Sequence, residues 1–384
     1  MKRKIFVSFV ITMMLFSFSI IVSAADQMLV EGISYYYSGD YNQSINKLEK
    51  YLKDDNQDTV DAFYFQTLAY IQLNQVTNAK ENMKILNNKG YSFGLINWKL
   101  GKLYLNEDGY YDSPFYNEAK KELELAKQLG ISSAGLHSDL AAAYQGLGNL
   151  EKAAEEYELA INKGALLGDY INLAALYKEI GKLDPALIIY KKVLGENPNN
   201  ASIYLNMGNI YLEKEQYQEA IDILNKGVKL DNSLLALKTK LASAYYFNKD
   251  YEMAKKYYND VIKANANIYQ AYYFLGEIYY QIDNNLKLAI NYYQQAVSYN
   301  NNYVNAYLSL GDLYLEQDET YKAMAQYLKA LESNSEYPDA HYRLALAYQK
   351  MNMKQAAIEE LRKTLHLDSS YNKARLLLNK LQED

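Results

Sequence analysis

Apolar and small residues recur with helical spacing along most of the chain. One example is a stripe of four residues spaced i, i+3, i+4 and i+7, namely Tyr204, Met207, Gly208 and Tyr211. Residues with this spacing lie on one face of an α-helix. A second stripe with the same periodicity follows within residues 220–227. The pattern therefore predicts two amphipathic helices in succession.

Polar breakers separate one predicted pair of helices from the next. The segments "NPNN" (197–200) and "YNNNY" (299–303) are typical of loops, and Asp184 followed by Pro185 resembles an N-cap with proline in the first turn. The chain is thus predicted to be a series of helical hairpins.

Three columns of residues repeat in register through the chain, at intervals of 33 to 35 residues with one of 40. The first column consists of Tyr35, Tyr70, Tyr104, Tyr144, Tyr177, Tyr211, Tyr245, Tyr279, Tyr314 and Tyr348. Three residues earlier stand Gly32, Thr67, Gly101, Ala141, Ala174, Gly208, Ala242, Gly276, Gly311 and Ala345. The third column, in the second helix, consists of Ser44, Ala79, Ala119, Ala153, Ala186, Ala220, Ala254, Ala289, Ala323 and Ala357.

Small residues in both helices let the two backbones approach closely, and the larger residues of each stripe fill the space around that contact. Because the tyrosines recur in all ten units, we expect most of them to belong to the core. One hairpin of this size cannot bury its own apolar face, so each must stack on its neighbours.

This pattern resembles the tetratricopeptide repeat family over residues 25–371. The resemblance implies an all-α, right-handed α-solenoid, with residues 372–384 as a capping helix. The predicted repeats are 25–59, 60–93, 94–133, 134–166, 167–200, 201–234, 235–268, 269–303, 304–337 and 338–371. It also implies that the first helices line a concave face that binds peptides or partner proteins.

The first 25 residues have the layout of a secretory signal peptide. Basic residues at positions 2–4 precede an apolar run from Ile5 to Val22, and small residues follow at Ala24 and Ala25. The run is also long enough for an uncleaved membrane anchor. Either alternative predicts an exported protein, in the periplasm, in the cell envelope or outside the cell.

Composition excludes several classes of function. The net charge of -6 disfavours attraction to nucleic acid or to anionic membranes, so contact with a membrane is expected only through an uncleaved N-terminal segment. The chain has no cysteine, and its three histidines have no partner at metal-ligand spacing. Without a catalytic constellation or a phosphate-binding loop, we predict no enzyme activity, cofactor or metal.

The residues that face the groove are predicted from their positions in the first helices of repeats five to ten. They are Asn172, Asn206, Asn209, Lys240, Tyr246, Tyr273, Glu277, Tyr280, Asn305, Asp312 and Tyr342. Amide side chains can pair with an extended backbone, and tyrosines can anchor a partner with little loss of entropy. Replacing Tyr273 and Tyr280 by Ala is expected to weaken partner binding with little effect on the melting temperature.

Two functional hypotheses follow. The first is a noncatalytic scaffold that binds protein partners, with a role in bacterial envelope assembly by analogy with the family. The second is a surface protein that binds glycan or peptidoglycan through the groove tyrosines.

An insertion at residues 106–117 carries aromatic residues near Trp98, Lys99 and Lys102. This segment is predicted either to form a second contact site or to fold down over its own repeat.

Overall fold

The computed structural model describes residues 24–53, 59–105, 115–265 and 267–383. The predicted signal peptide therefore lies almost wholly outside the described residues, as does most of the insertion at 106–117. The chain divides into two compact units, residues 1–189 and 190–384, and each is described by itself.

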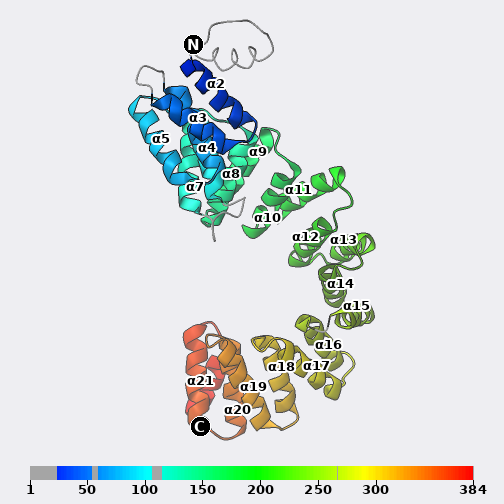
Figure 1. The fold of residues 1–384 in the computed structure, drawn as a ribbon. Coiled ribbons are helices and arrows are strands. Elements are labelled where there is room, and N and C mark those ends of the chain that lie inside the picture. The colour runs from blue at the N-terminus through cyan, green and yellow to red at the C-terminus, as the bar shows by residue number, and fades with distance from the viewer. Residues whose placement is uncertain (1–23, 54–58, 106–114, 266, 384) are drawn as a thin grey trace. The chain divides into compact units, whose positions relative to one another are not determined.

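The first unit consists of successive helix pairs (Figure 1). They are α2 (Ala24–Tyr37) with α3 (Tyr41–Leu52), α4 (Val60–Gln72) with α5 (Val76–Asn88), α6 (Gly94–Tyr104) with α7 (Tyr116–Gln128), α8 (Ala134–Gly146) with α9 (Leu150–Asn162), and α10 (Leu167–Glu179) with α11 (Leu183–Glu196). The division between the units falls inside α11.

The second unit continues the same arrangement. Its helices are α12 (Ala201–Glu213) with α13 (Tyr217–Leu230), α14 (Leu235–Phe247) with α15 (Tyr251–Ala264), α16 (Tyr269–Gln281) with α17 (Leu286–Tyr299), α18 (Val304–Glu316) with α19 (Thr320–Ser333), α20 (Pro338–Lys350) with α21 (Lys354–Leu367), and the last helix α22 (Asn372–Glu383). Over the described residues the secondary structure is helical throughout, which confirms the predicted all-α solenoid.

The first helices other than α10 pack mainly against the second helix of their own pair. In the second unit, first helices also contact the next first helix, α12 with α14, α14 with α16 and α18 with α20, whereas successive second helices do not approach to the same extent. Side-chain hydrogen bonds join α16 to α18, so the first helices of this unit form a surface of their own.

The small-residue column marks the closest contact within each pair. An added Cβ at Gly208 would lie 2.3 Å from Leu224, and one at Gly311 would lie 2.4 Å from the ring of Tyr327. Leu224 and Tyr327 both stand four residues after the second-helix alanine and are fully buried. The larger residue of the second helix thus fills the space that a side chain on the first helix would need.

The tyrosine column joins neighbouring repeats. Tyr70, Tyr104 and Tyr144 are buried, while the other seven are half-buried, so the column is less deeply placed than the sequence predicted. The hydroxyl of Tyr144 donates to Glu124 of the preceding repeat at 2.6 Å, and that of Tyr70 donates to Glu49 at 3.2 Å. These rings close the junction between repeats while their polar ends remain close to solvent.

The turn inside most repeats ends on a residue with positive φ. Glycine occupies this position at Gly39, Gly148 and Gly181, and other residues take it elsewhere, such as Glu215 (φ 58°) and Lys249 (φ 64°). The same left-handed geometry therefore closes hairpins of different sequence.

Within the described part of the chain, no helix is long and apolar enough to cross a membrane.

We expect Gly208→Val to destabilise the second unit by about 1–3 kcal/mol, because the new side chain overlaps Leu224 and the helices must separate. Gly195→Val is the matched control, since a Cβ at Gly195 meets no atom within 4 Å. Urea unfolding followed by circular dichroism measures both. Equal midpoints for the two variants would contradict the close contact at Gly208.

Candidate partner-binding surface

A second tyrosine column, not used in the sequence prediction, provides the hydrogen-bond partners of several predicted groove residues. It lies four residues after the second-helix alanine and consists of Tyr157, Tyr190, Tyr258, Tyr293 and Tyr327, all buried. A buried phenol hydroxyl requires a hydrogen-bond partner, and each of these finds one on a first helix.

In two repeats the partner is an asparagine of the following first helix. Asn172 donates to the hydroxyl of Tyr157 at 3.3 Å, and Asn206 forms a hydrogen bond with Tyr190. Asn172 is exposed and Asn206 is half-buried, so these amides retain contact with solvent while they satisfy the phenols.

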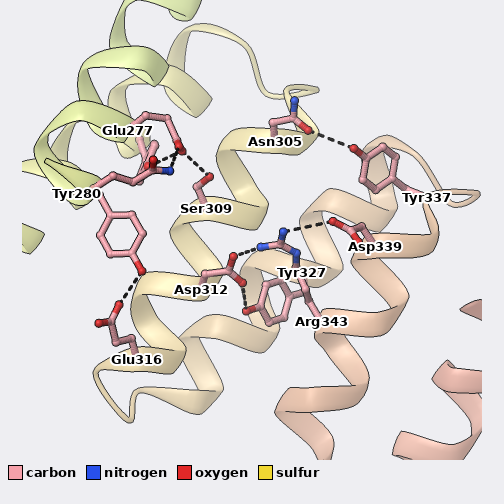
Figure 2. Close-up of polar contacts among 12 residues, drawn as sticks. Glu277, Tyr280, Asn305, Ser309, Asp312, Glu316, Tyr327, Tyr337, Asp339 and Arg343 are labelled. Atoms are coloured by element: carbon pink, nitrogen blue, oxygen red, sulfur yellow. Dashed lines mark hydrogen bonds and ion pairs between the residues drawn. The ribbon is translucent and has the colours of Figure 1, made fainter. Parts of the chain in front are cut away.

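Glu277 is the most deeply placed of the predicted groove residues, at 8% exposed. Its carboxylate accepts hydrogen bonds from the Tyr293 hydroxyl at 2.6 Å and from the Gln281 amide at 2.6 Å. It also accepts from the Ser309 hydroxyl at 3.0 Å (Figure 2). Because Ser309 belongs to the next repeat, Glu277 joins two repeats through neutral donors.

Asp312 is also bound inside the chain. It accepts from the Tyr327 hydroxyl at 2.8 Å and forms an ion pair with Arg343, which in turn donates to Asp339 at 3.2 Å (Figure 2). Burial lowers the pKa of Arg343 from its usual value. This guanidinium is therefore shared between two carboxylates and belongs to the internal network.

Tyr280 and Asn305 lie at the outer side of the same network. The hydroxyl of Tyr280 donates to Glu316 at 3.0 Å, and Asn305 accepts from Tyr337 at 3.3 Å (Figure 2). Burial and the Glu316 carboxylate raise the pKa of Tyr280. Asn305 and Glu316 are exposed, so both remain accessible to a partner.

Tyr246 belongs to a group of four rings that we name the aromatic ledge, consisting of Tyr217, Tyr246, Phe247 and Phe274. Tyr217 stacks on Phe247 with centroids 5.6 Å apart, and Tyr246 contacts Phe274 at 5.0 Å. Phe247 is 44% exposed although it contacts three other rings. Burial, followed by the nearby charge of Glu277, raises the pKa of Tyr246 to about 12.

Tyr273 packs more than the sequence predicted. Its ring contacts Phe274, Tyr293 and Tyr303 at 5.2–5.8 Å, and burial raises its pKa. The expectation that Tyr273→Ala would leave the melting temperature nearly unchanged does not suit this environment, because truncation would leave a cavity among three rings.

The remaining predicted residues lie apart from these contacts. Lys240 is exposed, Asn209 is half-buried, and the ring of Tyr342 contacts Tyr371 with centroids 5.0 Å apart. Tyr342 therefore lies beside the segment that leads into α22.

Sequence reasoning missed Phe247, Glu316 and Arg343. One signal could have identified part of this set. Where the residue after the first-helix small position is alanine, as at Ala142 and Ala175, the next repeat supplies an asparagine to the buried phenol. Where that residue is polar, it bonds the phenol of its own repeat, and the hydroxyls of Ser243 and Tyr258 lie 3.0 Å apart.

Near the N-terminus, the described end of the insertion folds onto the chain. Tyr116 packs against Gly146, where an added Cβ would lie 2.3 Å from its ring, and the indole of Trp98 donates to Asp139 at 2.5 Å. Phe115 stays 43% exposed. Tyr116 therefore packs on the following repeat rather than on its own. Tyr110 and Tyr111 lie outside the described residues.

Two histidines pair with glutamates inside the chain. Nδ1 of His137 lies 2.6 Å from Glu156, and Nδ1 of His341 lies 2.5 Å from Glu360. Among the described residues, no three His, Cys, Asp or Glu side chains converge as a metal site.

Comparison with known families is consistent with this geometry. Models described as tetratricopeptide repeat match residues 134–162, 179–242, 239–303 and 338–371, and one described as TPR repeat matches residues 311–352. The chain belongs to the tetratricopeptide repeat family. The matches cover repeats in both units of this TPR protein.

Similar curated proteins include the Hsp70-Hsp90 organising protein of Plasmodium falciparum (isolate 3D7), which is 29% identical over 43% of this chain and 29% of its own length. The BBSome complex member BBS4 of Bos taurus is 28% identical over 30% of this chain and 21% of its own length. The photosystem I assembly protein Ycf3 of Prochlorococcus marinus (strain NATL1A) is 28% identical over 33% of this chain and 83% of its own length. The chain thus spans less than a third of the length of the first two relatives.

Solved structures of similar fold include yeast Tom70, with a TM-score of 0.51 and 14% identity over 93% of this chain and 95% of that one. A tetratricopeptide repeat protein from Parabacteroides merdae ATCC 43184 has a TM-score of 0.52 and 18% identity over 66% of this chain and 98% of its own. At these identities the likeness supports the TPR fold alone.

We expect Tyr293→Phe to lower local stability more than Tyr157→Phe. The first change removes a donor from the buried Glu277 carboxylate and should cost about 1–3 kcal/mol, whereas Asn172 can bond water instead. Hydrogen exchange of α16–α17 and of α9–α10 measures the two effects. A larger loss of protection in Tyr157→Phe would contradict the role assigned to Glu277.

Proposed function

We propose that this TPR protein is a noncatalytic scaffold whose first helices in the second unit bind a segment of a partner protein. The observation that carries the proposal is the aromatic ledge, where Phe247 is 44% exposed yet fixed by contacts with three rings. A ring that is already ordered loses little entropy when a partner covers it, so it is a suitable anchor.

Accessible polar groups flank the ledge on the same set of helices. Lys240 and Asn305 are exposed, and the Tyr280–Glu316 pair lies at the ends of α16 and α18. Such groups suit the rim of an interface, where hydrogen bonds orient a partner around an apolar centre. Asn206 of the same unit retains a carbonyl acceptor for an extended backbone while its amide group bonds Tyr190.

The names of the relatives support an assembly role, since one is an Hsp70-Hsp90 organising protein and another a photosystem I assembly protein. For this chain we propose assembly of the bacterial envelope, because residues 1–25 have the layout of an export signal. Glycan binding by groove tyrosines is the alternative, and the experiment below distinguishes the two.

The test places the photo-crosslinker p-benzoylphenylalanine at position 247 in the full chain, expressed in the native organism. We expect an adduct with a protein at this position, because Phe247 is exposed on the proposed surface. Tyr321 of α19 provides the control position, since it is 75% exposed on a second helix.

Adducts that contain polysaccharide would favour the glycan alternative. Equal adducts at positions 247 and 321, or none at 247, would count against partner binding by the first helices.

Export is tested by fractionating the cells and measuring the mass of the intact protein. We expect it outside the cytoplasm, either shortened by about 25 residues or intact and membrane-bound. A full-length chain in the cytoplasmic fraction would exclude the proposed location.

A further inference from the structure

The two first helices at the centre of the second unit carry charge of one sign. α16 and α18 contain Glu277, Asp312 and Glu316 and no Lys, Arg or His. On α20, Arg343 is bound to Asp312 and to Asp339, and Lys350 pairs with Asp318 while it donates to the carbonyl of Leu315, the residue before Glu316. The network therefore contains more carboxylates than cations.

Two of these carboxylates have neutral donors in place of cations. Glu277 accepts from Tyr293, Ser309 and Gln281, and Glu316 accepts from Tyr280. Hydrogen bonds from neutral groups stabilise a carboxylate without adding positive charge, and the cation whose charge acts on Glu277 is Arg343, which is also bound to two other carboxylates. The electrostatic influence of Glu277 reaches the ledge, because its charge contributes to the raised pKa of Tyr246.

The ledge and this negative charge adjoin one another. Phe274 of the ledge is three residues before Glu277 on α16, so the two are neighbours on that helix, and Tyr280 stands one turn further on. An apolar anchor site therefore lies next to an excess of negative charge.

We propose that the partner segment held by this surface is basic, with a Lys or Arg side chain beside an apolar one. The apolar side chain packs on the aromatic ledge, and the cation binds Glu316 and the face of Tyr280. Charge complementarity favours this partner, whereas an acidic segment is repelled by Glu277 and Glu316. This inference rests on the proposed function and specifies the chemistry of the partner.

The experiment selects peptides from a displayed library of random 12-residue sequences, with the full chain as the target. We expect the selected peptides to be enriched in Lys or Arg next to aromatic or aliphatic residues. A synthetic copy of one selected peptide, with its basic residues replaced by Gln, should bind roughly tenfold more weakly.

The contribution of the surface is tested with Glu316→Gln, which removes one charge and keeps a group of similar shape. We expect roughly tenfold weaker binding of the selected peptide and a smaller loss of affinity between low and high salt. Glu332→Gln is the matched control, since Glu332 is exposed on α19 of the same repeat. This variant should bind the selected peptide with the affinity of the wild type.

The outcomes separate this inference from the proposed function. Selected peptides without basic residues, or an unchanged affinity in Glu316→Gln, would overturn the basic partner while leaving protein binding intact. If no peptide is selected, both proposals fail. An equal loss of affinity in Glu332→Gln would show a general charge effect and would also overturn the inference.

Discussion

The structure depends on the close contact between a small residue on each first helix and a large residue on its second helix. At Gly208 the side chain of Leu224 occupies the space that a Cβ would need, and at Gly311 the ring of Tyr327 does the same. This contact fixes the distance between the two helices. Where the large residue is tyrosine, it also brings a phenol hydroxyl to the first helix, so the packing geometry determines where polar partners must stand.

This constraint divides the polar residues of the first helices into two groups. Asn206 bonds the buried phenol of Tyr190 in the preceding repeat. Glu277 and Asp312 bond the phenols of their own repeats and are joined to the next repeat by Ser309 and Arg343. Phe247 and Tyr280 lie at the ends of α14 and α16, beyond these bonds, where they remain partly exposed. The repeated core thus leaves a limited part of the surface for recognition, and that part differs between repeats.

The sequence alone predicted the helical hairpins, because period and small-residue spacing are properties of single helices that recur in register. It predicted less of the surface, because a helical position does not reveal which group a side chain bonds across a junction. Asn172 reaches back to Tyr157 of the preceding repeat, while Glu277 bonds Tyr293 of its own repeat. Phe247 was missed because its position, twelve residues after Leu235, falls one residue beyond that of Tyr246, which was assigned to the groove. Its exposure depends on the neighbouring rings.

The most direct test determines which helices the selected peptide covers when it is bound. Hydroxyl-radical footprinting of the full chain, with and without the peptide, measures this coverage. Our account predicts lower oxidation of Phe247 and Tyr280 in the complex, with no change at Tyr299 and Tyr321, which are exposed on the second helices α17 and α19. Protection of Tyr299 and Tyr321, with Phe247 and Tyr280 oxidised as in the free protein, would contradict it.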